Sequence, residues 1–327
     1  MKKLLGLVLG MLLLHGCDDG DLTVDNIDFS TVTASSCGNI IYKINGSEVL
    51  ILNIPQAGFE TAFFNEPTSI DAPRFIPVNT VNRIIYRGYN GNVSPNSFCT
   101  PIPPASPVVV EEWIATDGSI EVKTMAVKED NNDPDFAGGK KINKYRHSIL
   151  VRNLSFAKPD GTTQIYATFD DLGNFDRPAV ALPFAFDSTL EKCTSSNTVY
   201  NFAGREAFRL LIDPALLTNA ETPAGSPRTG LLSNSVNRLD YAIYNDDGII
   251  NTNFFCAATP VAIPTAIENW TAVDGVLGIS GIIEVTTTVA GNVFQHDIHI
   301  KNAVLRRGNV EFKLADDYFL GALTASN

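Results

Sequence analysis

Positive charge is scarce in this sequence of 327 residues, which holds 24 lysines and arginines against 36 aspartates and glutamates. The formal net charge is −12, and an acidic surface of this kind repels the phosphate backbone of DNA and RNA. It also disfavours attachment to anionic lipid through charge alone. We therefore expect no nucleic-acid partner, and any membrane attachment must come from elsewhere in the chain.

Recognisable catalytic motifs are also missing. The sequence contains no Gly-x-Ser-x-Gly nucleophile turn, no His-Glu-x-x-His helix and no phosphate-binding glycine loop. Histidine is rare, and His147, His296 and His299 are interpreted as partly exposed strand residues. Residues three apart on a strand face opposite sides, so His296 and His299 cannot share a metal ion. We expect no metal site and no cofactor.

The first 16 residues have the organisation of a secretory signal peptide. Lys2 and Lys3 precede an apolar run from Leu4 to Leu14, which is too short to cross a bilayer as a mature helix. The segment Leu14–Cys17 resembles the bacterial lipobox, in which cleavage precedes a cysteine that becomes fatty-acylated, although His15 departs from that pattern. Lipid on Cys17 would anchor the chain through apolar burial, at about 0.8 kcal/mol per methylene. The alternative is an ordinary secreted protein with an incidental cysteine.

The residues that follow Cys17 indicate the cellular location of the protein. Asp18–Asp21 resembles the acidic stretch that directs lipoproteins of the Bacteroidetes to the outer face of the outer membrane, whereas in enteric bacteria an aspartate in this position indicates retention at the inner membrane. We expect an outer-membrane, lipid-anchored protein that is exposed at the cell surface. Loss of Lys2 and Lys3 on processing leaves 22 basic and 36 acidic residues, a net charge of −14.

The remainder of the chain contains one unit twice. We divide the sequence into a signal peptide (1–16), a lipidated cysteine with an acidic tether (17–21) and two β-repeats (22–178 and 179–327), which align at an offset near 157. The matches include Tyr42 with Tyr200, Tyr86 with Tyr241, Phe98 with Phe255, Trp113 with Trp270, and His147 with His296. Extra residues lie around 128–139 in the first repeat and around 276–281 in the second, and insertions of this kind belong in loops.

Short β-favouring segments between frequent turn signals predict an all-β fold. Hairpins are expected at 40–52 and 199–212, and short helical turns near 214–217 and 316–320. We predict two tandem homologous domains, each a β-sandwich or a partly closed barrel.

Four cysteines remain besides Cys17, and four cysteines allow three disulfide connectivities. A unit that once stood alone must have bridged within itself, which predicts the pairs Cys37–Cys99 and Cys193–Cys256, at separations of 62 and 63 residues. Disulfides persist in exported proteins. Buried free thiols are the alternative, and a metal site is disfavoured because no pair of cysteines has ligand spacing.

Three further segments carry candidate sites. Trp113 and Trp270 each follow the second cysteine of their repeat by 14 residues, and they either pack in the core or expose a ring that stacks on sugar. Asp187-Ser188-Thr189 resembles the O-glycosylation motif of exported Bacteroidetes proteins, which would place a glycan on Ser188. The acidic segment Glu129–Asp135 lacks the glycine and glutamate of a calcium-binding EF-hand loop and is interpreted as a solvated loop tip.

The acidic start at Cys17 and the cysteine-framed repeats together resemble two-repeat surface lipoproteins of flavobacteria, and this resemblance implies no activity. Our leading hypothesis is a non-enzymatic envelope protein that displays two β-modules and binds a glycan, a peptide or a protein partner. Two linked weak sites gain avidity without new contacts. The alternatives are an envelope hydrolase, with a site assembled from distant residues such as His147 or the acidic loop, and a structural spacer.

Overall fold

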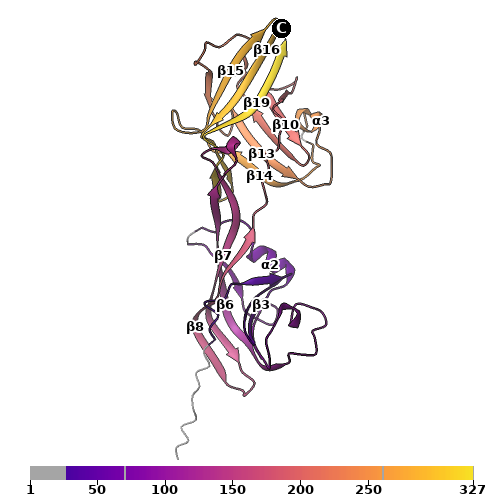
Figure 1. Ribbon diagram of the computed structural model, residues 1–327, viewed down its shortest axis with the longest axis vertical. Helices are drawn as coiled ribbons and strands as arrows, with labels where there is room; N and C mark the ends of the chain where they lie inside the picture. The colour runs from indigo at the N-terminus through magenta and orange to yellow at the C-terminus, as the bar shows by residue number, and fades with distance from the viewer. Residues whose placement is uncertain (1–26, 70, 260, 327) are drawn as a thin grey trace, which may run out of the picture.

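The computed structural model describes residues 27–69, 71–259 and 261–326. Strands are the main secondary structure in this part of the chain, which confirms the predicted all-β class, and they form antiparallel sheets. The signal peptide, Cys17 and the acidic tether lie outside the described residues. The two halves lie end to end, and the C-terminus is at the far end of the second half (Figure 1).

The first half is built around a single sheet in the order β1-β2-β3-β5-β6-β7-β8, with β4 also paired to β6. Strand β6 pairs with β5 through Val109–Ile114 and with β4 through Ser119–Val122, and its register with β7 shifts between these segments. Such bulges bend a strand. Two segments of β6 therefore pair with different strands, one with β5 and the other with β4. The elements are β1 (Ser35–Cys37), β2 (Ile40–Asn45), β3 (Glu48–Asn53), α2 (Gln56–Ala62), β4 (Arg74–Pro77), β5 (Arg83–Tyr89), η1 (Pro95–Ser97), β6 (Val109–Asp130), η2 (Pro134–Phe136), β7 (Lys140–Ala157) and β8 (Thr163–Pro178).

The second half also begins with three short strands, a helical turn and two further strands, but its described residues contain no strand as long as β6, β7 or β8, and they form two separate sheets. One sheet has the order β18-β17-β14-β13-β11-β10-β9 and the other β12-β15-β16-β19. The break between β14 and β15 contains the extra residues 276–281. The elements are β9 (Glu191–Lys192), β10 (Thr198–Ala203), β11 (Glu206–Leu211), η3 (Pro214–Leu217), β12 (Arg228–Leu231), β13 (Arg238–Tyr244), α3 (Thr252–Cys256), β14 (Ala266–Ala272), β15 (Ile282–Ala290), β16 (Val293–Lys301), β17 (Val304–Arg307), β18 (Val310–Lys313) and β19 (Asp317–Ser326).

Most local elements agree with the sequence prediction. The hairpins β2–β3 and β10–β11 form where they were expected, with Gly46 and Gly204 at their turns, and the helical turn at 214–217 is η3. The helical turn expected at 316–320 is wrong, because this segment pairs with β16 as strand β19. The common origin of the two halves stays a prediction from the sequence.

Both predicted disulfides are present, and the alternative of free thiols is wrong. Cys37 is bonded to Cys99 with a Cα–Cα distance of 6.0 Å, and Cys193 to Cys256 with a distance of 5.3 Å. Each bond closes a loop of about sixty residues. In the chain-entropy model a loop of this length adds roughly 4 kcal/mol of stability.

The tip of the β6–β7 hairpin packs against the second half. The acidic side chains of segment 129–135 are largely exposed, but η2 inserts Phe136 into the hydrophobic core of the second half. The Phe136 ring lies 5.3 Å from the ring of Tyr318 and 5.6 Å from that of Phe184. The exposure of segment 129–135 agrees with its interpretation as a solvated loop tip, and Phe136, which follows this segment, joins the two halves.

Glycine makes this close approach of the hairpin feasible. A Cβ at position 139 would lie 2.1 Å from the carbonyl oxygen of Leu314, so only Gly139 fits. The backbone amide of Asp316 donates to the carbonyl oxygen of Ala137 at 2.8 Å. Backbone hydrogen bonding thus continues from one half to the other.

Arg307 of β17 forms a second link between the halves. Its guanidinium lies 2.6 Å from the carboxylate of Glu268 and over the ring of Trp270. It also donates to the hydroxyl of Tyr145 and to the carbonyl oxygen of Asn65, both in the first half. Because these groups are mostly buried, each depends on the others to satisfy its hydrogen bonds.

We expect Phe136→Ala to lower the free energy of unfolding by about 3 kcal/mol, since truncating a buried phenylalanine costs roughly 3 to 5 kcal/mol in a core. Urea unfolding of the protein measures the change. The matched control is Phe75→Ala, because Phe75 is 63% exposed and its truncation should change stability by less than about 0.5 kcal/mol. Equal stability of the two variants would contradict the role given to Phe136.

Candidate functional site

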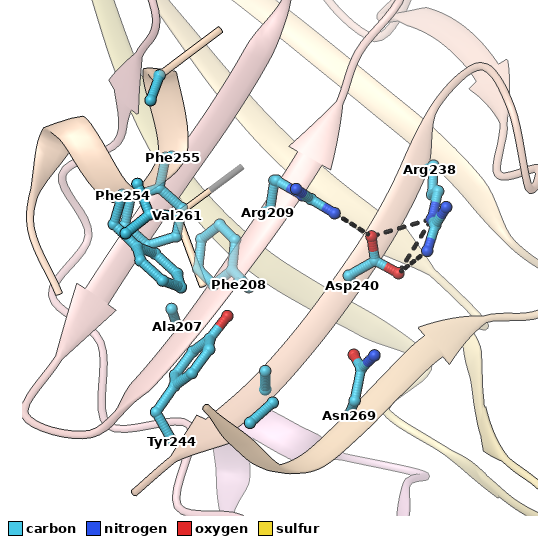
Figure 2. Close-up of a pocket in the computed structure, with 13 residues that line it drawn as sticks. Ala207, Phe208, Arg209, Arg238, Asp240, Tyr244, Phe254, Phe255, Val261 and Asn269 are labelled. Atoms are coloured by element: carbon cyan, nitrogen blue, oxygen red, sulfur yellow. Dashed lines mark hydrogen bonds and ion pairs between the residues drawn. The ribbon is translucent and has the colours of Figure 1, made fainter. Parts of the chain in front are cut away.

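A pocket of about 210 Å³ lies in the second half, on the face of the seven-stranded sheet opposite the core (Figure 2). Strands β11, β13 and β14 form its floor, and α3 stands at one side. Because neighbours along a strand point to opposite faces, Tyr241 and Trp270 enter the core whereas Asp240 and Asn269 line the pocket. The core and the pocket are two faces of the same strands.

The pocket is hollow because small side chains form its floor. The strand register pairs Ala207 with Ala242, and Ala242 with Asn269. At the corresponding place in the first half the register pairs Arg87 with Glu112, whose side chains form an ion pair at 2.5 Å. In the first half, large side chains therefore fill the space that is open in the second half.

A polar row crosses the three strands beside this floor. Arg209, Asp240 and Thr271 are direct neighbours in the register. The buried Asp240 carboxylate, only 8% exposed, accepts hydrogen bonds from Arg209 at 3.2 Å and from Thr271 at 2.8 Å. Arg238, two residues earlier on β13, donates to it through Nε and Nη2 at 3.1 and 3.0 Å. Asp240 thus fixes the orientation of both guanidinium groups, as Figure 2 shows.

The corresponding row of the first half is aliphatic. Ile51, Ile85 and Ile114 align across β3, β5 and β6. Ile51 and Ile85 are buried in a hydrophobic cluster. Placing charges at such positions is costly unless each finds a partner, so packing alone gives no reason for the polar row. The polar row sets the second half apart from the first.

Aromatic side chains form the other side of the pocket. The ring of Tyr244 lies 5.1 Å from that of Phe254 at an angle of 87°, and Phe254 lies 5.3 Å from Phe255 at 88°. Burial raises the pKa of the Tyr244 hydroxyl, an effect that Arg209 opposes and Asp240 reinforces. The hydroxyl therefore stays neutral at physiological pH and can both donate and accept a hydrogen bond.

The disulfide and a helix cap position the aromatic side. Cys256 is the last residue of α3, and its bond to Cys193 ties the helix to the sheet. The Asn251 side chain accepts a hydrogen bond from the backbone amide of Phe254 at 3.1 Å, which begins the helix as an N-cap.

The two tryptophans face the core, and the interpretation of Trp113 and Trp270 as ligand-facing aromatics is wrong. Both side chains are fully buried. Each indole Nε1 donates to a glutamate two residues earlier, Glu111 at 2.7 Å and Glu268 at 3.1 Å. The alternating direction of strand side chains decides this placement, because each tryptophan falls on the core side of its strand.

His147 is buried in a polar cluster, and its interpretation as a partly exposed residue is wrong. Its Nδ1 lies 2.8 Å from the hydroxyl oxygen of Thr124, to which Arg74 also donates at 2.8 Å. The Thr124 hydroxyl thus lies between the Arg74 guanidinium, which donates to it, and the His147 ring, whose buried Nε2 has no hydrogen-bond partner among the described residues. Arg228, Thr287 and the equally buried His296 repeat this arrangement in the second half.

The histidine clusters are structural. Burial lowers the pKa of His147 to about 3, and the positive charges of Arg177 and Arg74 add to this effect. The ring has no exposed surface with which to contact a substrate. Its distance along β7 from Lys140, where the acidic loop ends, is about 23 Å at 3.3 Å per residue. The structure therefore does not bring His147 and the acidic loop into one site.

The remaining sequence candidates lie apart from the pocket. His299 faces away from His296, as the strand period predicts, and its Nδ1 is 2.8 Å from a carboxylate oxygen of Asp317. Ser188 is exposed in the segment that joins the halves, and its carbonyl oxygen accepts a hydrogen bond from the Ala322 amide. Glycosylation of Ser188 stays a prediction.

Neither a metal cluster nor a membrane-spanning helix is found in the described part of the chain. No three histidine, cysteine, aspartate or glutamate side chains there are grouped closely enough to hold a metal ion. No helix among these residues has the length and apolar character needed to cross a bilayer. Comparisons with protein-family models, with curated proteins and with solved structures find no match to this chain.

The positions at which the two repeats agree do not predict the pocket, because its charged residues lie where the repeats differ. The informative positions are the differences, where Ile51 aligns with Arg209 and Ile85 with Asp240. The first pair is 158 residues apart, as are Tyr42 and Tyr200, and the second is 155 residues apart, as are Tyr86 and Tyr241. A search for apolar residues of one repeat that become charged in the other would have found both residues.

The buried histidines make stability depend on pH. The folded-state pKa of His147 lies below the unfolded value of 6.5. Between these two pKa values the imidazole is protonated in the unfolded chain and neutral in the native chain. Its contribution is complete above pH 6.5 and is lost as the pH falls toward 3, at up to about 1.4 kcal/mol per pH unit. We expect the stability difference between the wild type and His147→Asn, measured by urea unfolding, to shrink over this range. A difference that stays constant from pH 7 to pH 4 would contradict the assignment.

Proposed function

We propose that the chain is a cell-envelope lipoprotein that binds a small polar ligand in the pocket of its second half without converting it chemically. The observation that carries this proposal is the polar row Arg209–Asp240–Thr271, which stands where the first half has three isoleucines. Pockets that combine an apolar wall with a few fixed polar groups are typical of ligand sites.

The chemistry of the lining residues supports binding over catalysis. Asp240 is the single carboxylate among them, and they include no histidine, cysteine, serine or threonine. Both oxygens of Asp240 are bonded to the two guanidiniums and to Thr271, so this group is not poised as a base or a nucleophile. The Tyr244 hydroxyl is the other lining group that could transfer a proton, and burial raises its pKa further above physiological pH, so it is suited to hydrogen bonding rather than to proton abstraction.

The first half is suited to act as a spacer. Its corresponding face is closed by Arg87, Glu112 and the isoleucine row. The halves lie end to end (Figure 1), and Phe136 and Arg307 fix the junction. With an anchor at Cys17, the first half would hold the pocket away from the membrane. This arrangement joins the binding and spacer hypotheses in one molecule.

We expect the mature protein to carry fatty acid on Cys17, to enter the detergent phase of a detergent–water partition, and to be accessible to protease on intact cells. Cys17→Ser should abolish fatty-acid labelling and shift the protein to the aqueous phase. The control is Lys3→Ser, which changes the leader but leaves the lipobox intact. Labelling that persists in Cys17→Ser would contradict the anchor.

The binding proposal predicts that binding is lost when the polar row is replaced by the aliphatic row of the first half. The variant Arg209→Ile/Asp240→Ile/Thr271→Ile recreates the aliphatic row, and replacing paired charges by packed apolar residues is often neutral for stability. We expect this variant to fold and to lose ligands that the wild type binds in a screen of sugars, amino acids and short peptides by saturation-transfer NMR. Arg306→Ile, which removes an exposed ion pair on the same sheet, is the control. A folded triple variant with unchanged binding would overturn the proposal.

A further inference from the structure

The pocket has a net positive charge although the chain as a whole has a net charge of −12. Arg209 and Arg238 contribute two positive charges and Asp240 contributes one negative charge. The single positive charge that remains is balanced by one carboxylate, whereas the two negative charges of a phosphate dianion exceed it. A neutral ligand can accept hydrogen bonds from the guanidinium groups, but it leaves the remaining positive charge unbalanced, and hydrogen bonds between ionised partners are the stronger ones.

The hydrogen-bonding capacity left in the pocket also suits a carboxylate. Asp240 engages Nη2 of Arg209 and both Nε and Nη2 of Arg238. Each guanidinium has five N–H groups in a planar fork, so both retain donors for a ligand. The Arg209 and Arg238 side chains are 51% and 41% exposed. Asp240 holds them in place in advance, which lowers the cost of ordering them on binding.

The rest of the pocket suits a ring that bears hydroxyl groups. Phe254, Phe255 and Tyr244 offer aromatic surface against which the C–H face of a pyranose can pack. Asn269, on the side of the pocket that also holds Asp240, can donate and accept hydrogen bonds (Figure 2). The volume of about 210 Å³ is below the ~300–1,000 Å³ of pockets for drug-sized ligands, so it suits a single ring.

We infer that the pocket binds a uronic acid residue, with the sugar carboxylate on the guanidinium groups of Arg209 and Arg238 and the ring along Phe254 and Phe255. This inference rests on the proposed function and names the ligand class for the same pocket. Arginine recognises carboxylates through paired N–H bonds, which accounts for the choice of arginine at both positions.

The test is titration calorimetry on the mature chain carrying Cys17→Ser, with D-glucuronic and D-galacturonic acid as probes. The matched probes are glucose and galactose, which lack the carboxylate, and acetate and triglycine, which lack the sugar ring. We expect at least one uronic acid to bind tenfold or more tightly than its neutral counterpart and than acetate. Arg209→Gln should weaken that binding at least tenfold and Phe254→Ala several-fold, and the control Arg306→Gln should leave it unchanged.

The results distinguish failure of the uronic acid inference from failure of the proposed function. Neutral sugars that bind as tightly as the uronic acids, and without regard to Arg209, would overturn the ligand class but leave a functioning pocket. Acetate or triglycine binding as tightly as the uronic acids would show a carboxylate site without sugar specificity and would also overturn it. No binding of the uronic acids, with other ligands lost in the triple isoleucine variant, would overturn only this inference. No ligand of any kind in the pocket would overturn the proposed function as well.

Discussion

The pairing register of β11, β13 and β14 is the constraint on which the second half depends. A strand alternates its side chains between two faces, so the register that places Tyr241 and Trp270 in the core also places Asp240 and Asn269 in the pocket. A slip of one residue would bury the charges and expose the core. The register is anchored by the core face, which leaves the opposite face free to carry polar groups and small side chains.

The two halves differ in how their outer faces are built. The first half closes its outer face with aliphatic and ion-paired side chains, and it extends the β6–β7 hairpin until Phe136 enters the core of its neighbour. The second half breaks its long strands and leaves a pocket beside its disulfide. Their buried Arg–Thr–His clusters are nevertheless alike. The similar clusters hold the sheets of each half together, and the outer faces are where the two halves differ.

Sequence patterns predicted the parts of this protein that depend on local chemistry. Turn glycines located the hairpins at 40–52 and 199–212, and the spacing of four cysteines gave their pairing once the repeats were aligned. The segment 316–320 was misread as helical, because pairing with β16 outweighs the weak preference of five residues. The burial of His147 escaped notice because its partners Arg74 and Thr124 come from distant positions in the chain.

By itself the sequence determined the all-β class, the hairpins and the disulfide pairing, since each follows from residue type and spacing along the chain. Only the tertiary structure decided that Phe136 belongs to the second half and that Trp113 and Trp270 face inward. It alone brought Arg209, Arg238 and Asp240 together opposite Phe254. These arrangements join residues tens of positions apart, and a contact between distant residues exists only after the sheets have formed and packed.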